Sequence, residues 1–231
     1  MSLEVLYEDN HLIAVNKRSG DITQGDKTGD TPLPEIIQAW LKEKYNKPGN
    51  VFCGVIHRLD RPTTGIVLFA KTSKALARMN QQFQTKEVQK IYWAITEKSN
   101  VPDNGRLINY LRKDTVKNKS FSFDKEVSEG KKAELTYSKI AESDRYDLFE
   151  VLPRTGRHHQ IRVQLSNIGA IIKGDLKYGA KRSNPDGSIC LHARKLMFVH
   201  PVSKENIVIT APVPKEDTLW DFFSRRVLDE R

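Results

Sequence analysis

Cysteine and long apolar runs are both scarce in this chain of 231 residues. Only Cys53 and Cys190 are present, which is too few for a disulfide framework or a four-cysteine zinc site. No apolar run approaches the roughly 20 residues that cross a bilayer, and the N-terminus lacks the basic and apolar regions of a secretion signal. These absences argue against a secreted or membrane-spanning protein and predict a soluble protein of the reducing cytoplasm.

Negative charge is also in short supply. The 38 Lys and Arg residues outnumber the 29 Asp and Glu residues, which gives a formal net charge of +9 and a pI near 9.4. Such a balance favours polyanionic partners such as nucleic acid. Solubility alone explains the same excess equally well, so composition leaves both interpretations open.

The pattern of apolar residues predicts an α+β fold with a mixed, largely antiparallel sheet and flanking helices. Short β-branched or alternating runs predict strands, and apolar residues at helical spacing predict helices. The strands are expected at residues 12–15, 53–56, 65–70, 90–96, 133–140, 146–152, 191–201 and 206–212, and the helices at 33–45, 73–84, 155–169 and 215–228. No repeat or change of composition indicates a second domain.

Two details of this prediction concern helix caps and a charged segment. Ser73 is expected to cap the helix that follows it, and Thr155 the helix that contains Arg162. Residues 112–132 are polar and charge-dense without sustained periodicity, which predicts a mobile insertion.

Asp60 stands between Arg58 and Arg61 in the stretch HRLDRPTTG, in a turn between two predicted strands. Constrained connections often display functional groups, and positive charge on both sides would keep a carboxylate ionised and suited to act as a nucleophile. An Asp that only stabilises the turn by pairing with an arginine explains the same spacing. The stretch alone does not decide between the two.

A second group of cations occurs in the stretch LPRTGRHHQIRVQL, which contains Arg154, Arg157, His158, His159 and Arg162. Arginines and helix N-termini both attract phosphate, although a solvated basic helix face has the same pattern. A metal site is rejected, because adjacent histidines point in different directions on a helix and no Cys or acidic neighbour completes a ligand set.

Five blocks of sequence, taken in order, resemble the motifs of RluA-type pseudouridine synthases. They are HRLDRPTTGIVLFAKT, KIYWAI, LPRTGRHHQIRVQLSNIG, IIKGDLKYG and LHARKLMFVHP, and the resemblance spans residues 6–214. It implies a single catalytic domain over residues 1–231, without a separate N-terminal RNA-binding domain, that isomerises uridine to pseudouridine in structured RNA. It also implies that the enzyme uses no cofactor and no metal, and it favours a monomer that acts on rRNA or tRNA.

The resemblance assigns a role to each matching residue. Asp60 would be the nucleophile, attacking either the ribose or the uracil ring. Arg162 would pair with Asp60, and Tyr92 would lie against the target uracil. Arg58 would fill the space left when the target nucleotide is flipped from its stack. The further residues expected to bind RNA are Arg61, Arg154, Arg157 and His158, and those expected to line the pocket are Leu59 and Ile161.

Some positions depart from the family pattern. The segment NKRSGDITQG replaces the usual Lys-Pro-Ala-Gly sequence, and His158 and Gln164 replace Thr and His near Arg162. These departures concern the choice of substrate rather than the chemistry. The residues interpreted as structural are Asp175, Tyr178, His192 and His200.

Two rival functions use the same residues. The first is a non-catalytic RNA-binding protein, which the intact Asp60, Tyr92 and Arg162 argue against. The second is a hydrolase that uses His57 with Asp60, but no Ser or Cys nucleophile motif accompanies them.

Overall fold

The computed structural model describes residues 3–25, 28–215 and 217–229, and the chain divides into two compact units. The first unit comprises residues 1–89 and 193–212, and the second comprises residues 90–192 and 213–231. Each unit has its own buried apolar cluster. The expectation of one catalytic domain over the whole chain stays a prediction.

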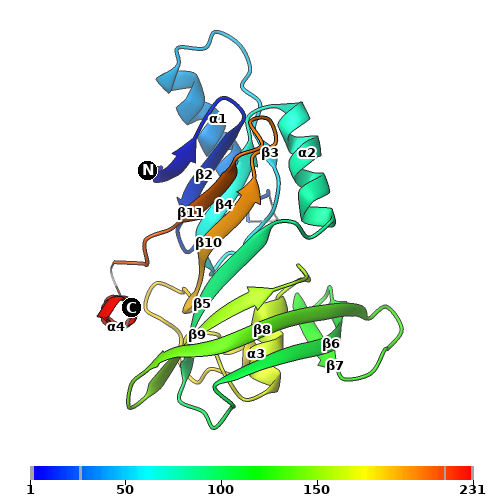
Figure 1. The fold of residues 1–231 in the computed structure, drawn as a ribbon, viewed down its shortest axis with the longest axis vertical. Helices are drawn as coiled ribbons and strands as arrows, with labels where there is room; N and C mark the ends of the chain where they lie inside the picture. Colours follow the sequence, from blue (N-terminus) through cyan, green and yellow to red (C-terminus); the bar gives the residue numbers. More distant parts are fainter. Residues whose placement is uncertain (1–2, 26–27, 216, 230–231) are drawn as a thin grey trace. The chain divides into compact units, whose positions relative to one another are not determined.

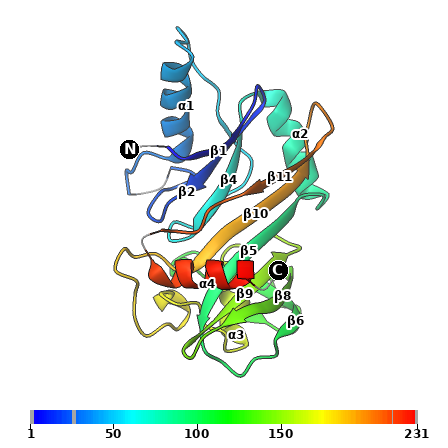
Figure 2. The same cartoon turned by 60° about the vertical axis from the view of Figure 1, so that its left-hand side comes forward.

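The first unit is built on a central run of strands (Figure 1). Their order is β1 (Val5–Glu8), β2 (Leu12–Lys17), β4 (Thr64–Ala70) and β10 (Leu191–Val199), with β3 (Gly54–Val55) on β4 and β11 (Asn206–Thr210) on β10. β2 runs antiparallel to both β1 and β4, and β11 runs antiparallel to β10 (Figure 2). Every residue of β4 is buried, which explains why its sequence is continuously apolar rather than alternating.

Two helices belong to the first unit, α1 (Leu33–Lys44) and α2 (Ser73–Gln84). Both lie where apolar spacing predicts them. The expected cap of α2 is wrong by one residue, because the side chain of Thr72 rather than Ser73 accepts the Ala75 N–H, at 3.1 Å. Both residues carry a hydroxyl, so local composition does not distinguish them.

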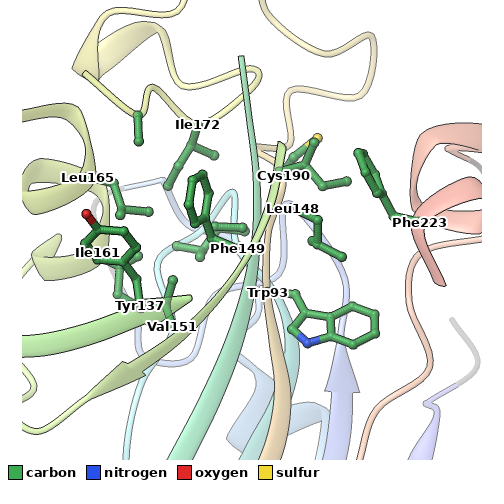
Figure 3. Packing of buried hydrophobic residues seen from close by; sticks show 14 of the residues in the cluster. Trp93, Tyr137, Leu148, Phe149, Val151, Ile161, Leu165, Ile172, Cys190 and Phe223 are labelled. Atoms are coloured by element: carbon green, nitrogen blue, oxygen red, sulfur yellow. The ribbon is translucent and has the colours of Figure 1, made fainter. Parts of the chain in front are cut away.

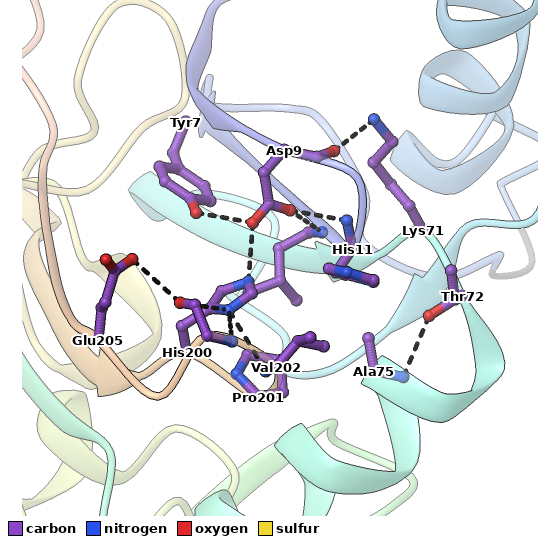
Figure 4. A network of polar contacts seen from close by, with 12 residues as sticks. Tyr7, Asp9, His11, Lys71, Thr72, Ala75, His200, Pro201, Val202 and Glu205 are labelled. Atoms are coloured by element: carbon purple, nitrogen blue, oxygen red, sulfur yellow. Dashed lines mark hydrogen bonds and ion pairs between the residues drawn. The ribbon is translucent and has the colours of Figure 1, made fainter.

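A polar network joins the β1–β2 turn to the β10–β11 turn within this unit (Figure 4). The carboxylate of Asp9 accepts the Tyr7 hydroxyl at 2.8 Å and lies 2.7 Å from His200 Nε2. The backbone N–H of Ser203 donates to His200 Nδ1 at 2.9 Å, so both ring nitrogens of this buried histidine are engaged. Burial and the Asp9 hydrogen bond raise the pKa of Tyr7 to about 12.

The second unit also contains antiparallel strands, in the order β5 (Gln89–Glu97), β9 (Tyr146–Pro153), β8 (Lys131–Glu142), β6 (Asn104–Asp114) and β7 (Lys119–Phe123). Its helices are α3 (Gln160–Asn167), a short 3-10 turn (Leu176–Tyr178) and α4 (Thr218–Asp229). The expected antiparallel pairing of residues 133–140 with 146–152 is confirmed.

The core of the second unit uses both faces of its strands (Figure 3). On β9, Phe149 and Val151 point to the side where Leu165 of α3 lies, whereas Leu148 points to the side of Phe223 in α4. Successive strand residues face opposite ways, so two helices can each pack on one face.

The prediction of a mobile insertion at residues 112–132 is wrong. Residues 119–123 form β7, which pairs with the end of β6 from Tyr110 opposite Phe123 to Asp114 opposite Lys119. The sequence KSFSF alternates polar and aromatic residues over five positions only, a signal too short to stand out in a highly charged segment.

The expected fold class is confirmed, with strands that are largely antiparallel and helices that flank them. Within the described ranges, no helix is both long enough and apolar enough to span a membrane.

Candidate active site

Asp60 lies in the connection between β3 and β4, as predicted. Its backbone carbonyl accepts the Thr63 N–H at 3.0 Å, which closes a tight turn through Arg61 and Pro62. The proline ring restricts its own backbone and that of the residue before it. The half-buried Asp60 is therefore displayed from a chain segment with little conformational freedom.

A buried lysine holds this turn from beneath. Lys17, at the end of β2, is only 1% exposed, and its ammonium donates to three carbonyls, those of Arg18 at 2.9 Å, Arg61 at 2.9 Å and Thr63 at 2.8 Å. The Arg61 carbonyl also accepts the Gly20 N–H at 3.1 Å. An ammonium carries three donors, so Lys17 is fully used in joining the loop after β2 to the Asp60 turn.

Burial lowers the pKa of Lys17 from 10.5 to about 8, and the carboxylates of Asp21 and Asp60 oppose that shift. Lys17 and Asp60 thus interact electrostatically. Sequence reasoning missed this residue, although a lysine at the end of the apolar strand LIAVNK was a visible signal.

Lys17→Met should reveal this titration. The folded protein releases the Lys17 proton near pH 8 and the unfolded chain near 10.5. Between those values the unfolded chain binds more protons, so the unfolding free energy of the wild type rises with pH relative to the variant. The rise should reach about 3 kcal/mol, because each pKa unit corresponds to about 1.4 kcal/mol. Urea unfolding of both proteins at a series of pH values measures it. A difference that does not change with pH would contradict the assignment.

The two arginines beside Asp60 bind the loop after β2. Arg58 donates to Gln24 Oε1 at 2.9 Å, and Arg61 donates to Thr28 Oγ1 at 3.2 Å and forms an ion pair with Asp30. Both arginines are exposed, so they remain accessible to a polyanion. Their expected roles in RNA binding and base flipping stay predictions.

His57 has a structural role. Its Nε2 accepts the Leu68 N–H at 3.1 Å, and its ring stacks on Phe83 with centroids 5.1 Å apart. A nitrogen that already accepts a backbone N–H has no free lone pair for use as a base. This contact argues against the hydrolase that would use His57 with Asp60.

Gly65 allows β10 to approach the strand that follows the Asp60 turn. Its φ is +109°, and a Cβ at this position would overlap the backbone of Ala193. Only glycine satisfies both conditions, so the start of β4 is held close against β10.

In the second unit, Arg162 lies on α3 and is buried, with a side chain 5% exposed. It forms a bidentate ion pair with Asp175, Nε to Oδ2 at 2.7 Å and Nη2 to Oδ1 at 2.8 Å. The Tyr178 ring lies beneath the guanidinium, 5.1 Å from Cζ. The Asp175 carboxylate orients Arg162 by this planar contact. The expected pairing of Arg162 with Asp60 stays a prediction.

The expected start of this helix at Thr155 is wrong. α3 begins at Gln160, and His159 before it has a left-handed backbone with φ of +54°. Thr155 instead accepts the Glu134 N–H at 2.9 Å and donates to Gln160 Oε1 at 2.7 Å. These contacts with β8 and with the Gln160 side chain hold the segment outside the helix.

The expected divergence of His158 and His159 is not observed. Because the two residues precede the helix, their rings stack with centroids 3.7 Å apart. Burial and nearby cations, Arg162 first among them, lower the pKa of His159 to about 2, so its ring is neutral. His159 Nδ1 lies 2.9 Å from the Tyr178 hydroxyl. Among the residues described, no group of three His, Cys, Asp or Glu side chains could hold a metal ion.

The remaining predicted site residues of the second unit lie on or near its strands. Tyr92 is on β5 opposite Val151, half-buried against the core. Arg154 and Arg157 are exposed, and Arg157 Nε donates to the Lys132 carbonyl at 3.0 Å. His158 Nδ1 lies 2.9 Å from Ser120 Oγ.

The two residues expected to line the pocket are both buried, Leu59 at 8% exposure and Ile161 at 7%. Ile161 belongs to the apolar core of the second unit. Their contact with a substrate stays a prediction.

Comparison with known proteins gives concordant matches. The family model described as RNA pseudouridylate synthase matches residues 11–167. A tRNA pseudouridine synthase C of Pasteurella multocida is 34% identical, and the match covers 94% of this chain and 93% of the relative. A ribosomal large subunit pseudouridine synthase C of Vibrio vulnificus is 31% identical, and the match covers 92% of this chain and 66% of the relative. The solved structure of human RNA Pseudouridylate Synthase Domain Containing 4 shares the fold, with a TM-score of 0.78 at 23% identity, over 96% of this chain and 93% of that one.

Proposed function

Because the chain belongs to the RNA pseudouridylate synthase family, we propose that it converts specific uridines of tRNA or rRNA into pseudouridine. The observation that carries the proposal is the match over residues 11–167, which includes the turn that displays Asp60. The names of the relatives, one for tRNA and one for rRNA, support RNA of either kind as the substrate.

In the proposed reaction, Asp60 is the nucleophile and the uracil base is transferred within one nucleotide. The bond between ribose C1′ and uracil N1 breaks, a bond between C1′ and C5 forms, C5 loses its proton and N1 gains one. Asp60 attacks either C1′ or the uracil ring and is released when the new bond is complete. Tyr92 lies against the uracil and assists removal of the C5 proton.

A single carboxylate is sufficient for this chemistry. Glycosidases use a second carboxyl group to protonate the leaving group, but uracil leaves as a delocalised anion that stays in place and recombines. The ammonium of Lys17, which interacts electrostatically with the Asp60 carboxylate, favours negative charge in this region.

Access to the uridine requires it to be flipped from the RNA stack, at a cost of a few kcal/mol. A net charge of +9 favours binding of the RNA backbone and offsets this cost. We propose that Arg58, which is exposed two residues before Asp60, occupies the space that the base vacates. We expect the enzyme to act as a monomer in the cytoplasm.

The test is release of tritium from tRNA and rRNA transcripts labelled at uracil C5. Each turnover removes the C5 hydrogen, so the wild type should release tritium in proportion to the pseudouridine formed at mapped positions. Retained RNA binding with no release from any cellular RNA would instead support a non-catalytic RNA-binding protein.

A further inference from the structure

One face of the β6–β7 hairpin carries aromatic side chains that the core does not use. In β7, Phe121 and Phe123 alternate with Ser120 and Ser122, so the two rings share one face. Phe121 is 37% exposed, whereas Ser120 on the opposite face is 2% exposed. The residues packed beneath the hairpin, on the face of Ser120, include Leu111, Ala133, Val163 and Tyr178.

The neighbouring strand β6 adds one cation to the same face, and β7 itself supplies a second. Tyr110 lies opposite Phe123, and Arg112 lies opposite Phe121, and residues directly opposite in an antiparallel pair share a face. The Arg112 guanidinium lies 5.2 Å from the Phe123 ring centre, and Lys119 Nζ lies 5.8 Å from that of Phe121. We call Tyr110, Arg112, Lys119, Phe121 and Phe123 the aromatic face.

The free edge of β7 is closed to an added strand at Ser120, the second residue of the strand. The Ser120 N–H donates to the Tyr178 hydroxyl at 2.8 Å, and that hydroxyl lies 3.3 Å from the Ser120 carbonyl. Strand addition needs these backbone groups, so their use by Tyr178 favours a partner that contacts the face of the hairpin rather than its edge.

We propose that the aromatic face binds an unpaired segment of the substrate RNA, with bases stacked on Phe121 and Phe123 and phosphates near Arg112 and Lys119. The inference rests on the proposed function. Exposed strand aromatics interleaved with cations are the means by which sheets bind single-stranded RNA. Residues 112–132 hold seven Lys or Arg against four Asp or Glu, which suits an anionic partner.

The aromatic face adjoins the Arg162 site within the second unit. Lys119 Nζ lies 5.1 Å from the Tyr178 ring, the same ring that lies 5.1 Å from Arg162 Cζ. Phosphates that contact Lys119 would therefore lie near residues expected to serve catalysis. This position makes the face a determinant of which RNA is accepted.

The test compares Phe121→Leu with the wild type for binding of a fluorescein-labelled oligouridine of about twelve nucleotides. Leucine keeps an apolar strand residue but removes the flat ring, so the Kd should rise about tenfold, within the range for loss of one stacked base. Phe121→Trp should restore binding. The matched control is Val116→Ala, in the hairpin turn and 94% exposed, which should bind as the wild type does.

Two further readouts separate stacking from charge. The dependence of log Kd on log salt should keep its slope in Phe121→Leu, whereas Arg112→Ala should lower the slope by about one phosphate contact. Phe121→Leu should lower the affinity for a paired RNA duplex by less than about twofold, because the bases of a duplex are not free to stack on the protein. If Phe121→Leu lowers the affinity for single-stranded and duplex RNA equally, the proposal is overturned.

Binding and turnover distinguish this inference from the proposed function. Phe121→Leu should lower tritium release at limiting RNA and leave the rate at saturating RNA unchanged. Unchanged oligouridine binding by a folded Phe121→Leu protein would reject the inference even if the enzyme is active. Absence of tritium release by the wild type would reject the proposed function, while the oligouridine comparison still decides the inference.

Self-association that Phe121→Leu abolishes, with RNA affinity unchanged, would assign the face to a second copy of the chain.

Discussion

Asp60→Asn is expected to lower the rate of pseudouridine formation by on the order of 10⁴-fold or more, as removal of a catalytic nucleophile does elsewhere. The amide is close to the carboxylate in size, so the turn closed by Thr63 and held by Lys17 should persist. Tritium release under single-turnover conditions measures the loss. RNA affinity should stay within about threefold, because the change removes no cation that contacts phosphate.

Asp144→Asn is the matched control, since this carboxylate is exposed in the β8–β9 turn of the other unit. It should turn over RNA at the rate of the wild type. Full activity in Asp60→Asn would refute the assignment of the nucleophile and would leave Asp60 as a turn-stabilising residue.

Arg162→Ala is expected to abolish activity and to lower the unfolding free energy by about 3–5 kcal/mol, the usual cost of leaving one partner of a buried ion pair without the other. Asp175 is 1% exposed, and Arg162 supplies two hydrogen bonds to its carboxylate. Urea unfolding measures the stability, and tritium release measures the activity.

The double variant Arg162→Met/Asp175→Leu separates these two effects. It removes both buried charges, so it should recover most of the lost stability, yet it lacks the guanidinium and should stay inactive. A stable double variant that turns over RNA would show that Arg162 has only a structural role. Arg145→Ala, which removes an exposed arginine from the same unit, serves as the control for general loss of positive charge.

Much of the fold could be predicted because its signals are local. The buried strand β4 and the antiparallel pair β8 and β9 follow from short runs of β-branched, aromatic or alternating residues, and the structure has these elements where they were expected. The turn that carries Asp60 was predictable for the same reason, since Pro62 restricts the backbone and Gly65 permits a conformation that other residues rarely adopt, both within a few residues.

The predictions of helix start and of disorder were wrong where residues distant in the chain make contacts that local sequence preferences do not reveal. Thr155 has the composition of a helix cap, but Glu134 on β8 and the Gln160 side chain take its hydroxyl. The helix consequently starts later, and His158 stacks on His159 instead of diverging from it. In β7, a strand partner in β6 and the Tyr178 hydroxyl at the edge stabilise a segment whose charge suggested disorder.

The sequence by itself determined the family, the alternation of strands and helices, and the turn on which Asp60 stands, because each depends on residues close together in the chain. Only the tertiary structure decided the partners of the buried charges. Lys17 reaches carbonyls 44 and 46 residues away, and Arg162 reaches a carboxylate 13 residues away. A buried charge must find its hydrogen bonds wherever the folded chain supplies them, and no local pattern encodes that choice.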